Sequence, residues 1–312
     1  MPVQPERAPL DSGPFAHTAV AYGSDEEFLH RIPDLVVGGL RDGQRVLVVT
    51  CERKLDLLTE TLGEDARRVD RQPSHRWYGH PMRTLSAYHD YVRERRPSLI
   101  VGEVYWAGRT DAEAREWIRY ESAINAVLAR LPVAVWCLYE RGAAPDDLLR
   151  VHPRYLDAGD VEPSGLYVPP ERFRLPDDEL PFGDPPGSAT VVSFAPENLT
   201  HLRLVVADHA RRAGLDHELT GSLVLSVSEV AANSVEHGAG HGRAALWVEG
   251  DELVCEITDS GGGLDDPLAG YGPPEPESQH GYGLWISRQL CDRVEIRSSP
   301  GLVRIRLRMS LR

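Results

Sequence analysis

The sequence has few cysteines, and they form no metal-binding or disulfide pattern. The four cysteines, Cys51, Cys137, Cys255 and Cys291, are scattered widely over 312 residues. Their spacing excludes a CxxC metal knuckle and argues against a disulfide framework, because both depend on closely spaced or paired cysteines. We interpret all four as reduced thiols in the core.

Long hydrophobic runs are also absent. The longest are "RVLVVT" at 45–50 and "VAVWCLY" at 133–139, far short of the roughly 20 residues that cross a bilayer as a helix. The first residues, "MPVQPERAPLDSG", lack the basic start and apolar centre of a signal peptide. We expect a soluble, cytoplasmic protein that does not contact the membrane.

Positive charge is scarce over most of the chain. The 34 Lys and Arg residues face 48 Asp and Glu residues, which gives a formal net charge of -14. Such a charge repels phosphate backbones, and no DNA-reading motif is present. We therefore expect protein partners or a small ligand, and no direct binding of nucleic acid.

The end of the chain is a basic exception. In "LVRIRLRM" at 302–309, Arg304, Arg306 and Arg308 alternate with apolar residues, which predicts a strand with one buried and one polar face. Two interpretations of the arginines stay open. We favour a solvated face over a surface that docks a partner.

Prolines concentrate in one segment, "VPPERFRLPDDELPFGDPPG" at 168–187. A proline-rich stretch without apolar periodicity is typical of an extended linker between domains. We therefore predict a first domain at 15–165, a linker at 166–187 and a second domain at 188–312.

The first domain alternates apolar, strand-like segments with amphipathic, helical ones. This alternation predicts an α/β fold with a mostly parallel sheet and helices on both faces. The helical segments are expected at 24–39, where Ser24 and Glu27 fit a capping box, and at 54–62, 81–94 and 111–129.

The turn after "RVLVVT" lacks the glycines of a phosphate-binding loop. It reads Cys51-Glu52-Arg53-Lys54, whereas a phosphate cradle uses glycines so that backbone N–H groups can converge on the anion. Together with "HTAVAYGSDEEF", "GGLRDGQRVLVVT", "WCLYE" and "HPRYL", this region resembles the MEDS sensory domain, a RecA-like sheet without a working P-loop. The resemblance implies a domain that senses an unknown signal or binds an unknown ligand.

A polar stripe follows one helix of the second domain. In "TGSLVLSVSEVAANSVEH" at 220–237, apolar residues are spaced for one helix face, and Glu229, Asn233 and His237 recur beside it at four-residue intervals. By itself the pattern also fits a solvated Glu–Asn pair. Two interpretations of His237 stay open. It either contacts phosphate or the lid, or it is simply the residue at the end of the helix.

A glycine-rich turn follows the strand-like "LVCEIT". It reads Asp259-Ser260-Gly261-Gly262-Gly263. Glycines permit positive φ and a close approach of backbone to a planar ligand, and a carboxylate at the strand end accepts a hydrogen bond from an exocyclic amine. The turn is interpreted as one wall of a nucleotide pocket, although a plain turn capped by Asp259 is the simpler alternative.

A second pair of glycines opens the next helix. Gly281-Tyr282-Gly283-Leu284 comes directly before "WISRQLCD", and the free N–H groups and positive dipole of a helix start suit a polyphosphate. Between Gly263 and Gly281, prolines and glycines predict a lid without regular structure.

These three elements, in this order, resemble the N, G1 and G2 boxes of the GHKL (Bergerat-fold) ATPases, in the compact form of the anti-sigma regulatory serine kinases. The resemblance covers about 188–312 and implies a Bergerat α/β sandwich that binds ATP and Mg²⁺. It implies that Asn233 ligates Mg²⁺, that Asp259 binds the adenine amino group and that Glu229 is the general base for a serine hydroxyl.

The glycines receive roles from the same resemblance. Gly261 and Gly263 would shape the adenine wall, while Gly281 and Gly283 would flank the phosphates, with Leu284 and His237 in the same binding set. One position departs from the family pattern: the usual Gly-Thr pair before the last strand, whose hydroxyl holds water against adenine, is replaced by Gly301-Leu302.

The expected function is a transcription regulator that sequesters a sigma factor and phosphorylates a STAS-domain anti-anti-sigma protein. A binding module with a degenerate nucleotide site is the alternative, and Leu302 favours it. A sensor histidine kinase would need a two-helix hairpin around Thr200-His201, for which the chain has too few residues before Glu229. The sequence leaves the oligomeric state open, with a homodimer as one possibility.

Overall fold

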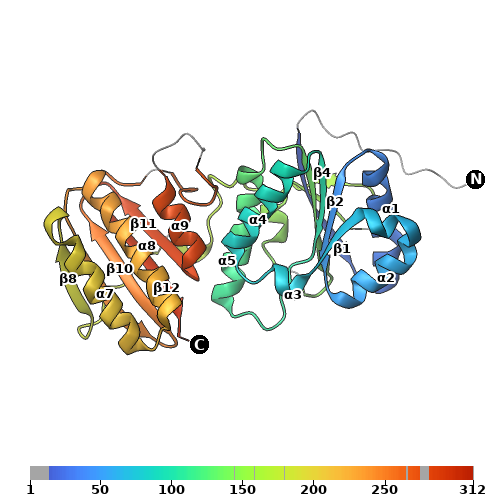
Figure 1. Ribbon diagram of the computed structural model, residues 1–312. Coiled ribbons are helices and arrows are strands. Elements are labelled where there is room, and N and C mark those ends of the chain that lie inside the picture. Colours follow the sequence, from blue (N-terminus) through green and yellow to red (C-terminus); the bar gives the residue numbers. More distant parts are fainter. Residues whose placement is uncertain are drawn as a thin grey trace, which may run out of the picture. The chain divides into compact units, whose positions relative to one another are not determined.

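The chain divides between Phe173 and Arg174 into two units, which are described separately below (Figure 1). The structure is a computed structural model that describes residues 14–143, 145–157, 159–178, 180–264, 266–274 and 281–311. Part of the predicted lid, at 265 and 275–280, lies outside the described residues. No helix in the described ranges combines the length and apolarity that a membrane span requires.

The first unit contains a seven-stranded sheet with the strand order β3-β2-β4-β5-β1-β6-β7. Neighbouring strands are parallel except for β6 and β7. The prediction of a mostly parallel sheet is therefore confirmed. The strands are β1 (Phe15–Tyr22), β2 (Arg45–Thr50), β3 (Val69–Pro73), β4 (Ser98–Gly102), β5 (Val133–Glu140), β6 (Arg154–Leu156) and β7 (Glu162–Pro163).

Helices cover both faces of this sheet (Figure 1). Helices α1 (Asp25–Arg41) and α2 (Glu52–Leu62) pack on one face, and α4 (Pro81–Glu94) and α5 (Asp111–Val127) on the other. Ser24 caps α1 by accepting a hydrogen bond from the Glu27 amide at 3.2 Å, as its place in the sequence predicted. Two short helices, α3 (Ser74–Trp77) and α6 (Leu148–Val151), and a 3-10 helix at Gly63–Arg68 complete the unit.

The second unit is a two-layer α/β sandwich. Its antiparallel sheet has the strand order β11-β12-β10-β9-β8, and three helices lie over one face (Figure 1). Val206, Val227 and Leu307 are wholly buried in the core between the layers. The elements are β8 (Thr190–Phe194), α7 (Leu199–Ala213), α8 (His217–Glu236), β9 (Gly242–Glu249), β10 (Glu252–Asp259), α9 (Tyr282–Leu290), β11 (Arg293–Ser299) and β12 (Leu302–Ser310), with 3-10 helices at Pro176–Asp178 and Pro196–Asn198.

The arginines of β12 lie on the other face of this sheet and are not solvated. Arg306 and Arg308 are buried, so the favoured interpretation of a solvated face was wrong. Glu256 on the adjacent strand, with only 1% of its side chain exposed, accepts hydrogen bonds from both Arg304 and Arg306. Arg308 is paired in the same way with Glu249, Glu252 and Glu295. The alternating arginines therefore form a second, ionic core.

A segment of the proline-rich region covers part of this ionic core. The Phe182 ring lies 4.2 Å from the Arg306 guanidinium and 4.6 Å from that of Arg297, distances typical of cation–π contacts. The carbonyl of Gly183 accepts hydrogen bonds from Arg304 and Arg306. Residues 180–183 thus belong to the packing of the second unit.

Candidate nucleotide-binding site

A cavity of about 540 Å³ lies in the second unit between α8, the end of β10 and the start of α9. This volume is within the ordinary range for small-molecule sites. Six of the residues predicted from the sequence line it: Asn233, His237, Asp259, Gly263, Gly281 and Leu284. Gly261, Gly283 and Glu229 are not among the lining residues: Gly261 adjoins Asp259, and Gly283 adjoins Asn233 and Glu229. The fold therefore brings together three motifs that are up to about fifty residues apart in the sequence.

Asp259 is held in place by the glycines around it. The Gly261 amide donates a hydrogen bond of 2.8 Å to Asp259 Oδ1. A Cβ atom on Gly238 would lie 2.8 Å from the same oxygen, and one on Gly261 would lie 2.5 Å from the Gly238 Cα. Any larger side chain would therefore displace the carboxylate. Among the described residues, Asp259 Oδ2 has no hydrogen-bond partner, so it can accept one from a ligand.

Glu229 and Asn233 lie one turn apart on α8 and face the start of α9. A Cβ atom on Gly283 would lie 2.9 Å from Asn233 Nδ2 and 3.3 Å from Glu229 Oε2. The absence of a side chain at Gly283 therefore lets the first turn of α9 approach both polar groups. Both side chains are only partly buried, so water and solutes can reach them.

Helix α9 begins at the cavity without a side-chain cap. Its N-cap residue is Gly281, at φ +94°, and no side chain accepts from its first amides among the described residues. The first N–H groups of a helix have no partner within the helix, and they carry its positive dipole end. Gly270, at φ +76°, passes so close to Leu284 that a Cβ atom would lie 2.7 Å from its backbone. This contact holds the described part of the loop against α9.

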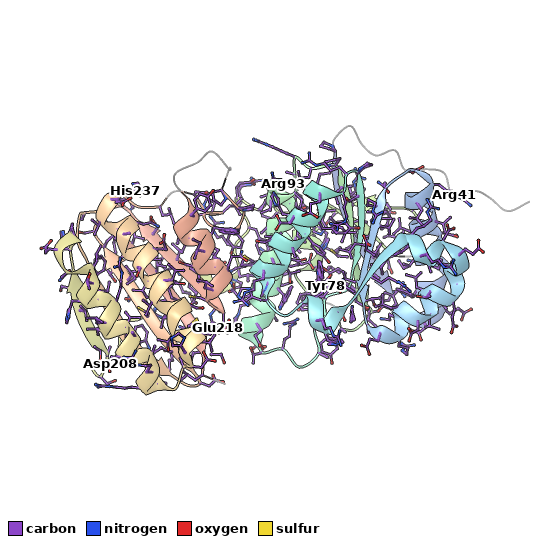
Figure 2. All side chains as sticks on the ribbon, viewed as in Figure 1. Arg41, Tyr78, Arg93, Asp208, Glu218 and His237 are labelled. Atoms are coloured by element: carbon purple, nitrogen blue, oxygen red, sulfur yellow. The ribbon has the colours of Figure 1, made fainter. Side chains whose placement is uncertain are left out.

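His237 lies at the far end of α8 from Glu218 (Figure 2). It is the C-cap residue of the helix, and its amide donates to the Asn233 carbonyl at 2.8 Å. Its side chain is 58% exposed and borders the cavity. His237 is therefore a helix-end residue that also belongs to the lining of the cavity.

Leu302, where the family pattern predicts a threonine, lies outside the lining of the cavity, and its neighbour Val303 lies inside it. Val303 is paired with Asp259 across β10 and β12, is 7% exposed and lines the cavity with Ile305. Leu302 is 42% exposed and does not belong to the lining. A valine therefore stands beside Asp259. The alternation predicted from the sequence puts Val303 and Ile305 on one face, but the sequence analysis did not name them, Gly238 or Gly270 as residues of the site.

In the first unit, charged side chains fill the space at the turn after β2, where the sequence lacks phosphate-binding glycines. Lys54 is 5% exposed, and its Nζ donates to Glu103 Oε1 at 2.7 Å. The hydroxyls of Tyr22 and Thr50 also donate to Glu103. This buried ion pair occupies the end of the sheet where a P-loop protein would hold phosphate. It agrees with a RecA-like sheet without a P-loop.

The prediction that all four cysteines are free thiols in the core is wrong for Cys51, which is only partly buried, whereas the other three are free and buried. Cys255 and Cys291 are core thiols of the second unit, and burial raises the pKa of Cys291 to about 12. Cys137 instead lies among His17, Glu121 and His152. Burial raises the pKa of Cys137 and lowers the pKa of His17 to about 4 and of His152 to about 3.

Two family models match the chain. Residues 192–309 match the histidine kinase-like ATPase domain family, and residues 16–153 match the MEDS family, described as the methanogen/methylotroph DcmR sensory domain. The chain thus combines a segment similar to the MEDS family with a segment similar to the histidine kinase-like ATPase domain family. The two matches follow the two units of the structure, and the predicted resemblance to an Rsb-type regulator with a MEDS domain is confirmed.

The second domain also resembles a curated protein. The serine-protein kinase RsbW of Halalkalibacterium halodurans is 26% identical over 113 residues, which are 33% of this chain and 70% of that protein. A crystal structure of the RsbU and RsbW domains of a Mycobacterium tuberculosis protein shares 18% identity, with a TM-score of 0.30. That match covers 39% of this chain and 32% of the other chain.

Proposed function

We propose that the chain is an anti-sigma regulator whose ATPase domain binds Mg-ATP and phosphorylates a serine of a STAS-domain anti-anti-sigma protein. In this proposal the same domain sequesters a sigma factor, and the MEDS domain regulates the activity of the ATPase domain in response to a signal. The observation that carries the proposal is the cavity in which Asp259, Asn233 and the uncapped start of α9 come together. The similarity to a serine-protein kinase supports the choice of reaction.

The residues of the cavity fit the chemistry of a Mg²⁺-nucleotide. Asp259 Oδ2 would accept a hydrogen bond from the adenine amino group, while Val303 and Ile305 provide an apolar surface for the ring. The amides at the start of α9 would donate to phosphate oxygens, and the Asn233 side-chain oxygen would ligate Mg²⁺. Mg²⁺ supplies charge neutralisation on the phosphates when bound.

Glu229 is the residue proposed to act on the protein substrate. Its carboxylate lies one helical turn from Asn233 and beside Gly283. It would accept the proton of the serine hydroxyl as that oxygen attacks the terminal phosphorus, and ADP would leave. A positioned general base typically contributes a rate factor of about 10²–10⁴.

Phosphate transfer to a purified partner tests the reaction. The full chain is incubated with radiolabelled Mg-ATP and each STAS-domain protein encoded in the same genome. We expect label on a serine of one of them with the wild-type chain and far less with Glu229→Gln. Nucleotide binding without transfer to any of these proteins would contradict the kinase proposal.

A binding module with a degenerate nucleotide site is the second candidate. Leu302 favours it, because the hydroxyl that the family pattern places before the last strand is missing there, and Val303, which is paired with Asp259, supplies none either. In that case the domain binds its protein partners and nucleotide acts only as a switch. The histidine kinase alternative is not supported, because His201 lies on α7, which packs on the sheet of the ATPase domain itself.

A further inference from the structure

Four buried side chains of the MEDS domain converge on one point. His17 comes from β1, Cys137 from β5, Glu121 from α5, and His152 directly follows α6. Each offers one candidate ligand atom, and the four atoms lie within 4.8 Å of one another. Strands β1 and β5 are adjacent and parallel, so His17 and Cys137 project from the same face of the sheet towards α5.

Four of the distances within this cluster match those between ligands of one small metal ion. Cys137 Sγ lies 3.2 Å from His17 Nε2 and 3.4 Å from Glu121 Oε2. Glu121 Oε2 lies 3.5 Å from His17 Nε2 and 3.6 Å from His152 Nε2. Ligands around a tetrahedral zinc ion are separated by roughly 3.2–3.8 Å, given bond lengths of about 2.0–2.3 Å.

Hydrogen bonds outside the cluster fix the tautomers of both histidines. His152 Nδ1 lies 2.9 Å from the Leu148 carbonyl, which can only accept, so Nδ1 carries the proton. His17 Nδ1 lies 3.0 Å from Asn125 Oδ1. That oxygen is identified because Asn125 Nδ2 donates to the carbonyls of Ser122 and Val151. Both Nε2 atoms therefore carry a lone pair on the side of the cluster, as in metal sites whose histidines are held by outer partners, and His152 Nε2 also lies 3.4 Å from the Tyr139 hydroxyl.

Glu121 provides a second indication of a ligand. Its side chain is 0% exposed. Oε2 accepts a hydrogen bond from Cys137 Sγ and the carboxyl also interacts with Tyr139, but Oε1 has no hydrogen-bond partner among the described residues. No Lys or Arg pairs with it in the part of the chain that the structure describes. A buried carboxyl oxygen without a partner is unfavourable, and a cation at the centre of the cluster would compensate it.

We propose that His17, Glu121, Cys137 and His152 bind a divalent transition-metal ion of the zinc type. Two imidazoles, a thiolate and a carboxylate form a set that suits Zn²⁺ in tetrahedral geometry. The ion displaces the thiol proton of Cys137 on binding. It would join β1, β5, α5 and the segment after α6, so its presence would stabilise the MEDS domain. The site does not depend on the proposed kinase function, because it belongs to the other unit.

The test uses the full chain, purified under reducing conditions, stripped with a chelator and reloaded with Zn²⁺ or Co²⁺. We expect about one ion per chain by elemental analysis, and with Co²⁺ the visible spectrum of a tetrahedral ion together with a thiolate charge-transfer band. Cys137→Ala should lose the charge-transfer band, and a His17→Ala/His152→Ala variant should lose the ion.

Two further variants separate ligation from mere folding. Cys51→Ala, in the same unit and outside the cluster, should keep the metal and the charge-transfer band. Asn125→Ala leaves all four ligands in place but frees the His17 ring, and it should weaken metal affinity by about 10–100-fold. The proposal is overturned if the wild type binds no ion, or if Cys137→Ala keeps the charge-transfer band while circular dichroism shows it folded.

Discussion

The two domains differ in what surrounds the start of a helix at the end of the sheet. Each has a helix that begins near the end of its sheet, α2 in the MEDS domain and α9 in the ATPase domain. Beside α2, Lys54 and Glu103 form a buried ion pair. Beside α9, Gly281 and Gly283 leave the first amides open to a cavity. The comparison teaches that charged side chains can fill the space at a helix start, whereas small residues can leave its first amides open to a ligand.

The largest effect is expected at the proposed general base. Glu229→Gln keeps the size and hydrogen-bonding capacity of the side chain but cannot take up the serine proton. Phosphate transfer should fall by about 10²–10⁴-fold, while the affinity for Mg-ATP should change little. Glu236→Gln, at an exposed position of the same helix, is the control in the radiolabel assay. Equal rates for wild type and Glu229→Gln would remove Glu229 from the mechanism.

Breaking the ion pair of the MEDS domain tests the other half of the comparison. Lys54→Met leaves Glu103 with an uncompensated, largely buried charge, so the free energy of unfolding of this domain should fall by about 3–5 kcal/mol. Arg45→Met removes a surface ion pair with Asp70, in which both side chains are at least 40% exposed, and should change stability by less than about 1 kcal/mol. Urea unfolding of the full chain measures both. Equal losses of unfolding free energy in the two variants would show that the Lys54–Glu103 pair contributes no more to stability than a surface ion pair.

A methyl group at Gly283 should partly close the open helix start. Gly283→Ala would place a Cβ atom 2.9 Å from Asn233 Nδ2, which forces Asn233 away from its place. We expect the affinity for Mg-ATP to drop by about tenfold, or roughly 1.4 kcal/mol. Gly221→Ala, on α8 with no atom within 4 Å of the new methyl group, should leave binding unchanged. Titration calorimetry distinguishes the two, and similar losses would point to a general effect on the fold.

The smallest expected effect is a gain. Val303→Thr restores a hydroxyl beside Asp259 at nearly constant volume, and one added hydrogen bond is worth about 1 kcal/mol, or roughly fivefold in affinity for ADP. Leu302→Thr is the matched control, because Leu302 is exposed outside the cavity. A gain of ADP affinity in Leu302→Thr and none in Val303→Thr would show that residue 302 is the position for the hydroxyl, as the sequence predicted.

Much of the architecture follows from local patterns in the sequence. The segments predicted at 81–94 and 133–139 correspond to α4 and β5, because long periodic or apolar runs specify their own conformation. The short strands β6 and β7 were not predicted, because two or three residues carry no periodicity and depend on their neighbours. The three motifs of the pocket were found from residue type and order.

What the sequence could not supply were contacts across the fold. The buried state of Arg306 depends on Glu256, fifty residues away, and on Phe182 from the proline-rich region. The cluster around Cys137 joins four separate elements, so the spacing of the cysteines gave no sign of it. Val303 rather than Leu302 lies beside Asp259 because of the strand register, which a turn sequence alone does not define.

Calorimetric titration of ADP and of Mg-ATP into the full chain tests the central claim most directly. The account predicts saturable binding by the wild type, loss of ADP and ATP binding in Asp259→Asn, and a selective loss of Mg-ATP affinity in Asn233→Ala. Asp251→Asn, at the exposed turn before β10, should bind as the wild type does. No heat of binding with the wild type, or full binding by Asp259→Asn, would contradict a nucleotide site at the start of α9.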